Sequence, residues 1–368
     1  MSSYKKTKLY KEQQLAFDRI IQDVEKPNKT KPLVLFVCGA AGTGKSEIIK
    51  HLVSTVGEEH VILTAPTAKA ARNISGKTIH RAMNFRLNAP IWKQNVQYVE
   101  LETIVRQETD PEFGKMLKRW RLGRTTHADQ VFLNSLSSKV GQTGWRDYVG
   151  HFLENYDQKK NMMMLAYTNC TIATLNQMTT TTLFPNEGEL YNLTRDTYTL
   201  SKNKKVPTVQ KEVMFRVGQN SRVMVYRNID DNLVNGEIGL VKNIKSLEDN
   251  VVEMDLDLCS TKTVYKLQVF QSPTSNVGAS QVWVTQFPIH SAYALTYHKA
   301  QGQTLDKVFL TAREKLPPAL FYVGASRVRT REDLHILSPN AHVSIRADVA
   351  AIREYKRLRK SIGKTHLL

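Results

Sequence analysis

The first part of the chain alternates between helix-like and strand-like hydrophobic patterns. Residues 9–25 carry four aliphatic side chains on one helical face, and Pro27 follows as a stop. The continuous apolar run "PLVLFVCG" then predicts a strand that is buried on both faces at the centre of a parallel sheet. A helix over "EIIKHLVSTV", a second buried strand over "HVILTAPT" and a second helix over "AKAARNI" are predicted next. This order of elements is typical of an α/β doubly wound domain.

The middle of the chain changes from helical to β-rich patterns. Residues 112–156 are predicted to be mostly helical, and "NMMMLAYTN" predicts a buried strand. Short alternating runs between Val213 and Val284, with the turn signal Asn235-Gly236, predict a small all-β insert. Within this insert Trp283 fits either a core position or a platform for stacking bases.

After Pro288 the α/β pattern resumes. It predicts a helix near residues 291–300, a strand over "KVFLTA", a helix over residues 319–327 and a strand over "DLHILS". The last residues form a basic pattern, "RADVAAIREYKRLRKSIGK", which predicts a helix with a solvated face or one that contacts DNA. Two α/β patterns in one chain suggest a duplicated architecture.

The charge balance narrows the class of partner. The 52 Lys and Arg residues exceed the 34 Asp and Glu residues, so the formal net charge is +18. Such a surplus favours nucleic acid as the partner, ahead of an anionic membrane surface. The three cysteines, Cys38, Cys170 and Cys259, lie far apart, so their spacing indicates neither a zinc site nor a disulfide framework and fits a reducing compartment. We find no apolar run of transmembrane length and no secretory signal.

The segment "GAAGTGKS", Gly39 to Ser46, fits the phosphate-binding pattern G-x-x-x-x-G-K-[ST]. Glycines let the backbone wrap around a phosphate, and the following helix presents its positive N-terminus to the anion. In this pattern Lys45 reaches the β- and γ-phosphates and Ser46 ligates Mg²⁺. The predicted strand before the loop and the predicted helix after it support the reading. The loop by itself indicates nucleotide binding without distinguishing a kinase, a GTPase or a motor.

Other segments along the chain resemble motifs of superfamily 1 helicases. "LYKEQQLAF" resembles the adenine-reading glutamine motif, "TAPTAKAA" motif Ia, "GKTIH" motif Ib and "IVRQETDPEF" motif IV. "FPIHSAYALTYHKAQGQTLDKVFL" resembles motif V, and "YVGASRVRTREDLHIL" resembles motif VI. Together they resemble the Pif/RecD branch, whose members move five-prime to three-prime on single-stranded DNA. The resemblance extends over about residues 9–338, and the order of the motifs is more specific than any one of them.

The resemblance implies a role for particular residues. ATP contacts fall on Gln13, Gly39, Gly42, Thr43, Gly44, Lys45, Ser46 and Gly302, with Ser46 also a Mg²⁺ ligand. Lys45, Arg106 and Arg327 are the candidate catalytic residues, the two arginines as fingers that stabilise charge on the transferring phosphoryl group. Candidate DNA contacts are Pro66, Thr67, Thr78, His80, His298, Lys299 and Gln301. For His298 a buried position satisfied by local backbone is the alternative, and for both arginines an ordinary surface position.

One expected part of the motor is missing from the sequence. In this family an acidic pair that holds Mg²⁺ and polarises the attacking water lies between motifs Ib and IV, together with a glutamine sensor in motif III. Only 25 residues separate His80 from Arg106; none is Asp, and the two glutamates, Glu100 and Glu102, lie in the approach to motif IV. Asp230-Asp231 and "VVEMDLDL" are weak substitutes because both fall in the β insert. The strands lost with this segment normally lie beside the phosphate-loop strand, which predicts exposed sheet edges.

We therefore predict an α/β fold with two RecA-like P-loop lobes, the first truncated, and a small SH3-like all-β insert. The predicted division is a first lobe over residues 1–90, a second lobe over 91–204 and 286–345, the insert over 205–285 and a basic helix over 346–368. The resemblance implies ATP-dependent five-prime to three-prime movement on single-stranded DNA and unwinding of duplex DNA, with turnover impaired by the missing acids. The expected partner is single-stranded DNA or forked duplex DNA, and the expected state is a monomer. The resemblance also implies roles in DNA repair, recombination and telomere maintenance in the nucleus, with cytoplasm and mitochondrion as alternative locations.

Three alternatives stay open at this point. The chain could hold single-stranded nucleic acid without hydrolysing ATP. A small-molecule kinase is disfavoured, because that class lacks the "HKAQGQT" and "SRVRT" segments. The chain could also be a fragment of a transposon-borne helicase, and the short interval could reflect an omitted exon.

Overall fold

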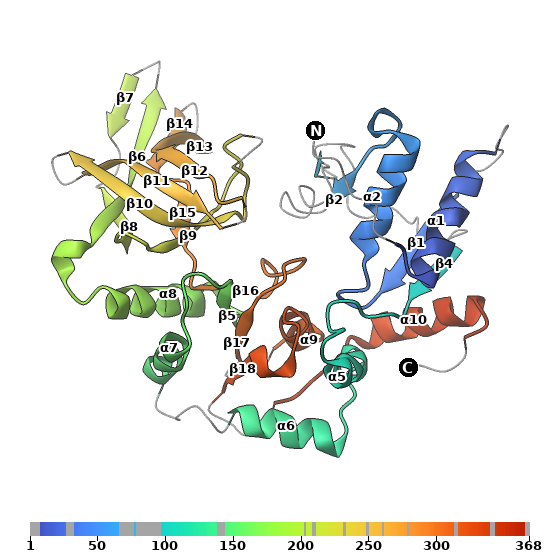
Figure 1. Cartoon of the computed structure of the whole chain (residues 1–368). Coiled ribbons are helices and arrows are strands. Elements are labelled where there is room, and N and C mark those ends of the chain that lie inside the picture. Colours follow the sequence, from blue (N-terminus) through green and yellow to red (C-terminus); the bar gives the residue numbers. More distant parts are fainter. Residues whose placement is uncertain are drawn as a thin grey trace. The chain divides into compact units, whose positions relative to one another are not determined.

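The computed structural model describes residues 8–26, 33–65, 77–78, 97–137, 144–201, 204–207, 211–230, 233–247, 250–259, 261–277, 280–312, 316–338 and 343–364. The chain divides into two compact units (Figure 1), one made of residues 1–142 with 300–368 and the other of residues 143–299. None of the helices in the described ranges is long and apolar enough to cross a membrane.

The first unit begins with the elements that carry the phosphate loop. They are α1 (Lys11–Val24), β1 (Leu35–Gly39), α2 (Lys45–Val56), the 3₁₀ turn η1 (Glu58–His60), β2 (Thr64–Ala65), β3 (Lys77–Thr78) and β4 (Gln97–Leu101). β1 pairs in parallel with β4, and β2 pairs in parallel with β3. Helices α1 and α2 contact each other, and a small core joins them to β4 through Ala16, Ile48, Val99 and Leu101. The predicted helix, strand and helix around the phosphate loop are confirmed.

Strand β1 lies at the edge of a short sheet rather than at the centre of a large one. In the described part of the chain its only strand partner is β4, and all five residues of β1 are partly exposed. The prediction of a strand buried on both faces is therefore wrong, because such burial needs a partner strand on each side. The predicted buried strand over residues 60–67 is also wrong where it is described: only Thr64–Ala65 is strand, and Ile62 is 74% exposed. Such exposed sheet surface is expected from the sequence, because strands that normally lie beside β1 are missing from the short interval before motif IV. The helix predicted over residues 68–74 lies outside the described residues.

The rest of the first unit supplies helices and a pair of parallel strands. These elements are α5 (Pro111–Arg121), α6 (His127–Ser137), β17 (Lys307–Thr311), α9 (Leu320–Ala325), η4 (Arg331–Asp333), β18 (Leu334–Leu337) and α10 (Val349–Ser361). β17 and β18 pair in parallel, as their apolar runs predict. Asp110 caps α5 by accepting a hydrogen bond from the Phe113 N–H at 3.0 Å. Trp120 of α5 is fully buried, with its ring 5.8 Å from that of Phe321 in α9.

The C-terminal helix α10 is part of the first unit's core. It packs against β4 (Figure 1), and Leu358 and Arg359 are 6% and 4% exposed. Arg359 donates through Nη1 to both carboxylate oxygens of Glu100, at 2.8 and 2.7 Å. The prediction of a solvated helix face is thus wrong for this side, because the buried Glu100 carboxylate needs a counter-charge that α10 supplies.

The second unit contains two helices, two parallel strands and a short strand, β15, that pairs antiparallel with β9 (Arg222–Val225). They are α7 (Trp145–Glu154), β5 (Met162–Ala166), α8 (Asn169–Leu183), β15 (Ile289–Ser291) and β16 (Ala294–Thr296), with β16 parallel to a fully buried β5. The helix predicted near residues 291–300 is wrong. The Asn176 side chain accepts the N–H groups of Tyr293 and Ala294 at 2.9 and 2.8 Å and donates to the Ala294 carbonyl at 3.1 Å. These contacts hold the segment extended beside β5.

The β-rich part of the second unit confirms the predicted all-β stretch and starts earlier than expected, at Tyr191. After the turn η3 (Glu187–Glu189) come β6 (Tyr191–Ser201), β7 (Lys204–Pro207), β8 (Glu212–Val217), β9 (Arg222–Val225), β10 (Ile238–Leu247), β11 (Asn250–Leu258), β12 (Val264–Gln268), β13 (Phe270–Val277) and β14 (Ser280–Gln286). One sheet has the order β12-β11-β10-β9-β15, and the other β13-β14-β6-β7 with β8 beside β6. Asn235-Gly236 lies between the antiparallel strands β9 and β10, as predicted. Trp283 is half-buried. The lobe boundaries at residues 90 and 345 stay a prediction.

Candidate nucleotide site and nucleic-acid contacts

The phosphate loop joins β1 to α2 in a conformation that requires glycine. Gly42 and Gly44 have φ of +84° and +74°, in the left-handed region that glycine favours. A Cβ atom on Gly39 would lie 2.5 Å from Thr43 Oγ1, and one on Gly42 would collide with Arg106. Gly44 is the residue before the first turn of α2, so the positive end of the helix faces the loop. The residues present therefore form a cradle that fits the phosphates of a nucleotide.

Lys45 lies against this cradle. Its ammonium donates to the carbonyls of Gly39 and Ala40 at 2.9 and 2.8 Å. The Thr43 hydroxyl donates to the Ala40 carbonyl at 3.0 Å and closes the turn. Ser46, the candidate Mg²⁺ ligand, follows as the second residue of α2 and is exposed.

Gln13 fastens α1 to the phosphate loop. Its side chain is 4% exposed and donates through Nε2 to the Thr43 carbonyl at 2.9 Å. Its Oε1 accepts the Tyr10 N–H at 2.9 Å, which completes a capping box at the start of α1. Both halves of the amide are thus used within the protein. The adenine-reading role of Gln13 stays a prediction, and it requires these bonds to be exchanged for bonds to the base.

The two predicted finger arginines both lie in the first unit with the loop. Arg106 donates through its backbone N–H to the Gly42 carbonyl at 3.2 Å and through Nη1 to the Ser326 carbonyl at 2.7 Å. Arg327 is 6% exposed and donates through Nε to the Val323 carbonyl at 2.7 Å. The alternative of an ordinary surface arginine is wrong for Arg327. The segments that resemble motifs IV and VI therefore meet at the phosphate loop.

A second contact locks these two segments together. The Asp110 carboxylate accepts from Arg331 through Nε at 2.9 Å, through Nη2 at 2.7 Å and through the backbone N–H at 3.0 Å. The Arg331 guanidinium and the bonds from backbone N–H groups hold the pKa of Asp110 below its usual range against the opposing effect of burial. Gln107 adds a bond from Nε2 to the Val328 carbonyl at 2.6 Å. These bonds hold the segment of Arg106 against the segment of Arg327.

The charges at this site are unbalanced. Burial lowers the pKa of Lys45 to about 8; the Cys38 thiol opposes this shift, while Arg121, Arg106 and Arg327 add to it. Burial, followed by the charge of Arg106, lowers the pKa of Arg327 to about 10. Depressed cation pKa values mean that the charged forms lack enough counter-charge in the protein. A polyanion placed among these groups relieves both effects, which is the arrangement that functional sites use.

Two residues at the site were missed by the sequence reasoning. The Tyr322 hydroxyl accepts the N–H of Ala41 in the phosphate loop at 3.0 Å. Arg121 donates to Cys38 Sγ at 3.1 Å, and its guanidinium lies 4.9 Å from the centre of the Tyr355 ring. Tyr322 is within the segment that resembles motif VI, so its proximity could have been found. Arg121 lies in the basic run "KRWRLGR", where no spacing distinguishes it from its neighbours.

The two glutamates of the short interval form ion pairs with residues of the C-terminal part of the chain. Glu100 lies beside Cys38 in the β1–β4 register, and its buried carboxylate pairs with Arg359. Glu102 pairs with Lys364 at 2.7 Å. Asp230 accepts the N–H of Leu233 at 2.8 Å in the connection between β9 and β10 of the second unit. Within the described ranges, no group of three or more His, Cys, Asp and Glu side chains is placed to hold a metal ion.

The candidate DNA contacts are only partly described. Thr78 lies on β3, whereas Pro66, Thr67 and His80 fall outside the described residues. The four residues of the motif V segment follow β16. His298, Lys299 and Gln301 are exposed, so the alternative of a buried histidine is wrong. Gly302 has φ of +80°, and the chain passes between the two units at residues 299–300, inside this segment.

Comparison with known proteins shows which family the chain resembles. Residues 8–108 match the family model described as PIF1-like helicase. An ATP-dependent DNA helicase PIF1 of Danio rerio is 26% identical over 283 residues, which cover 75% of this chain. This chain is therefore similar to Pif1-type helicases of superfamily 1. It spans 40% of the length of the Danio relative.

Solved Pif1 structures show that the fold is shared. The Pif1 helicase of Candida albicans superposes with a TM-score of 0.72 at 20% identity, covering 96% of this chain and all of the other. A Bacteroides Pif1 in complex with ADP-AlF3 and single-stranded DNA gives a TM-score of 0.69 at 20% identity, covering 97% of this chain and 99% of the other. The chain accordingly has the α/β Pif1 fold, into which the two predicted RecA-like lobes fit. The SH3-like character of its β-rich part stays a prediction.

Proposed function

We propose that this Pif1-type chain binds ATP at the Gly39–Ser46 loop and moves five-prime to three-prime along single-stranded DNA to unwind duplex. One observation carries the proposal: Lys45, Arg106, Arg121 and Arg327 gather around the phosphate loop with depressed pKa values for the lysine and Arg327. A triphosphate supplies the missing negative charge. The names of the relatives and the nucleotide and DNA in the Bacteroides complex support the same ligands. In this scheme Arg106 and Arg327 stabilise charge on the transferring phosphoryl group.

We further propose that ATP turnover is severely impaired. Ser46 gives Mg²⁺ a hydroxyl ligand, but Glu100 and Glu102 are paired with Arg359 and Lys364 and are not available to hold the ion or polarise water. Loss of a water-positioning acid and a metal ligand should lower the rate by several orders of magnitude. Other charged groups of such sites contribute rate factors on the order of 10³–10⁵. The same ion pairs favour a second candidate function, ATP-independent binding of single-stranded nucleic acid. Binding to forked duplex, a monomeric state, a nuclear location and a role in repair, recombination or telomere maintenance stay predictions.

The test separates nucleotide binding from turnover. Binding of a fluorescent ATP analogue and DNA-stimulated phosphate release are measured for the wild type and for Lys45→Ala. Lys50→Ala is the matched control, because Lys50 lies on the same helix in an exposed pair with Glu47. We expect ATP binding that Lys45→Ala abolishes and Lys50→Ala preserves, with phosphate release near background.

The outcomes distinguish the two candidates and their failure. Rapid DNA-stimulated release that depends on Lys45 would show that another acidic residue replaces the missing pair. Strand binding without ATP binding would favour the second candidate. Absence of both kinds of binding in a folded protein would contradict the proposal.

A further inference from the structure

Arg121, the last residue of α5, lies against the strand that leads into the phosphate loop. Its guanidinium donates through Nη2 to Cys38 Sγ at 3.1 Å, and Cys38 comes directly before Gly39. The same guanidinium lies 4.9 Å from the centre of the Tyr355 ring. These contacts place a cation at the base of the loop that is expected to hold the phosphates.

The contacts of Arg121 leave most of its hydrogen-bonding capacity unused. A guanidinium has five N–H donors, and a thiol sulfur is only a weak acceptor. In the part of the chain that the structure describes, Arg121 has no carboxylate partner, whereas Arg119 binds Asp129 through Nε and Nη2 at 3.0 and 2.5 Å. Burial opposes the charged form of Arg121, but the Cys38 thiol and two tyrosines favour it and raise its pKa. Arg121 therefore stays charged and has donors left for a stronger acceptor.

Arg121 also lies close to Lys45 and to the turn of the loop. Burial lowers the pKa of Lys45 most, and of the three arginines that add to this shift Arg121 contributes the most. Tyr322, whose hydroxyl accepts the Ala41 N–H of the loop, is one of the groups that act on the charge of Arg121. The guanidinium is thus near both ends of the segment from Cys38 to Ala41. An anion bound there would relieve the repulsion between Arg121 and Lys45.

The residues after the loop do not supply a free carboxylate to hold a divalent cation with Ser46. The acidic residues between Ser46 and Arg106 are all glutamates, namely Glu47, Glu58, Glu59, Glu100 and Glu102. Glu47, Glu100 and Glu102 form ion pairs. Glu58 and Glu59 follow the C-terminal end of α2, about 15 Å from Ser46 at 1.5 Å per helical residue. Mg²⁺ is usually held by one or two carboxylates together with the phosphates, so these residues fit the ion poorly.

We propose that Arg121 binds a phosphate oxygen of the nucleotide and supplies positive charge in place of Mg²⁺, so that this chain binds ATP without a divalent cation. The inference rests on the proposed function, because it concerns the same Gly39–Ser46 loop. A guanidinium suits this role because it is always charged and its planar fork matches phosphate oxygens. On binding, Arg121 exchanges the Cys38 sulfur, a weak acceptor, for a phosphate oxygen, a strong one.

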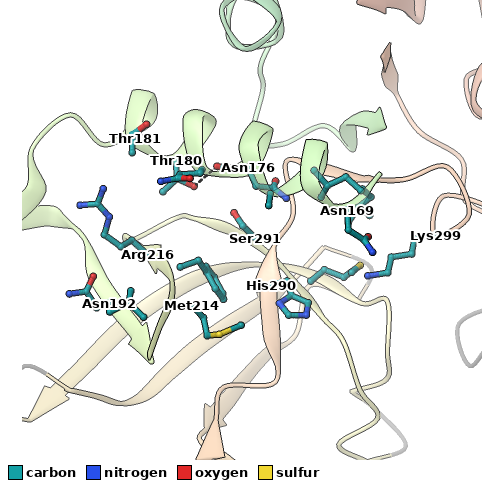
Figure 2. A pocket seen from close by; sticks show the side chains of 17 residues that line it. Asn169, Asn176, Thr180, Thr181, Asn192, Met214, Arg216, His290, Ser291 and Lys299 are labelled. Atoms are coloured by element: carbon teal, nitrogen blue, oxygen red, sulfur yellow. Dashed lines mark hydrogen bonds between the residues drawn. The ribbon is translucent and has the colours of Figure 1, made fainter. Parts of the chain in front are cut away.

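Another pair of cations lies in the second unit. The groove between α8 and β8 has a volume of about 860 Å³, with Arg216 and Lys299 at opposite ends of its lining (Figure 2). Arg216 pairs with Glu187 at 3.4 Å, and the lining contains no glycine from which a phosphate cradle could form. Lys45 is not part of this groove. Metal-free ATP that is bound at the loop must therefore depend on Lys45, which distinguishes it from ATP in the groove.

The test measures binding of the fluorescent ATP analogue by anisotropy, once with Mg²⁺ and once with EDTA. We expect the two wild-type affinities to agree within about threefold, because Arg121 replaces the charge of the ion, and Lys45→Ala to abolish both. Arg121→Gln should bind about tenfold more weakly than the wild type in EDTA, which is the effect of one charge-assisted hydrogen bond, and Mg²⁺ should restore most of this loss. Arg121→Lys keeps the charge without the fork and should bind at most about threefold more weakly.

Arg124→Gln is the matched control, because Arg124 is an exposed arginine of the same basic run. It should leave both affinities unchanged. A purely structural role of Arg121 would weaken binding by Arg121→Gln equally with Mg²⁺ and with EDTA, and this result would overturn the inference. An affinity of Arg121→Gln in EDTA that matches that of Arg124→Gln would overturn it as well.

The wild type alone provides a further test, which does not depend on whether a variant folds. Loss of ATP binding in EDTA, with binding in Mg²⁺ intact, would refute the metal-free site and leave the proposed ATP binding unaffected. No binding in either condition by the folded wild type would contradict the proposed function, and the inference with it.

Discussion

Helix α10 contains two arginines, Arg357 and Arg359, that lie two residues apart in different surroundings. Their substitution should therefore change the stability of the first unit by very different amounts. The Arg359 guanidinium is 5% exposed and the Glu100 carboxylate 1% exposed, with 2.7 Å between Nη1 and Oε2. The Tyr355 hydroxyl also donates to this carboxylate. Arg357 instead pairs with Glu354 on the surface, with exposures of 59% and 49%.

The magnitude follows from burial. Removing one partner of a buried ion pair leaves an uncompensated charge and costs about 3–5 kcal/mol. An exposed pair contributes roughly 0–1 kcal/mol. We therefore expect Arg359→Leu to remove a large part of the stability of the first unit, since whole domains are stable by only about 5–15 kcal/mol. Arg357→Leu should have almost no effect.

The assay must report on the first unit alone, because a chain with two units does not have to unfold in one step. Amide hydrogen exchange of the β1 and β4 peptides, followed by mass spectrometry, gives this local readout. Exchange in Arg359→Leu should be faster by about two to three orders of magnitude, since each 1.4 kcal/mol is a factor of ten. The double variant Glu100→Leu with Arg359→Leu should recover most of the loss, because neither charge is then left unpaired.

One result would refute this reasoning. If exchange of β1 and β4 in Arg359→Leu stayed within threefold of that in Arg357→Leu, the buried pair would not hold α10 on the sheet. The helix would then be the solvated element that its sequence suggests.

Three further predictions concern the nucleotide site and the β-rich unit. ATP affinity should fall about tenfold between pH 7 and pH 9, because Lys45, with a pKa of about 8, loses its charge over this range. Titration with the fluorescent analogue measures this affinity, and a flat pH profile would contradict the prediction. Gly42→Ala should abolish ATP binding in the same titration, because the new Cβ would collide with Arg106 at a backbone φ of +84°; retained affinity would show that the loop can rearrange. Burial lowers the pKa of His290 to about 4, so the free energy of unfolding should decrease as pH falls from about 6.5 to about 4. Urea titrations should show a shallower decrease for His290→Gln than for the wild type. Equal slopes for the two proteins would rule this group out as the cause.

Much of the site's chemistry could be predicted from local sequence. The pattern Gly39–Ser46 fixes a strand, a turn and a helix within a few residues, so its conformation depends on neighbours in the chain. The grouping of Lys45 with Arg106 and Arg327 followed from the resemblance, since Arg327 lies more than 200 positions after the other two residues. Arg121 could not be ranked in this way, because nothing in its local pattern records that it lies beside Cys38.

The sequence by itself determined the elements with a clear period, the phosphate loop and the absence of an acidic pair in the 25 residues before Arg106. Tertiary structure decided the features that depend on distant partners. The segment after Ile289 is extended because Asn176 takes its backbone groups, and β1 is exposed because β4 is its single described partner strand. The face of α10 is buried because Glu100 needs a counter-charge. Hydrophobic period reports which side of an element is apolar, whereas burial also requires a partner to cover that side, and only the folded chain supplies it.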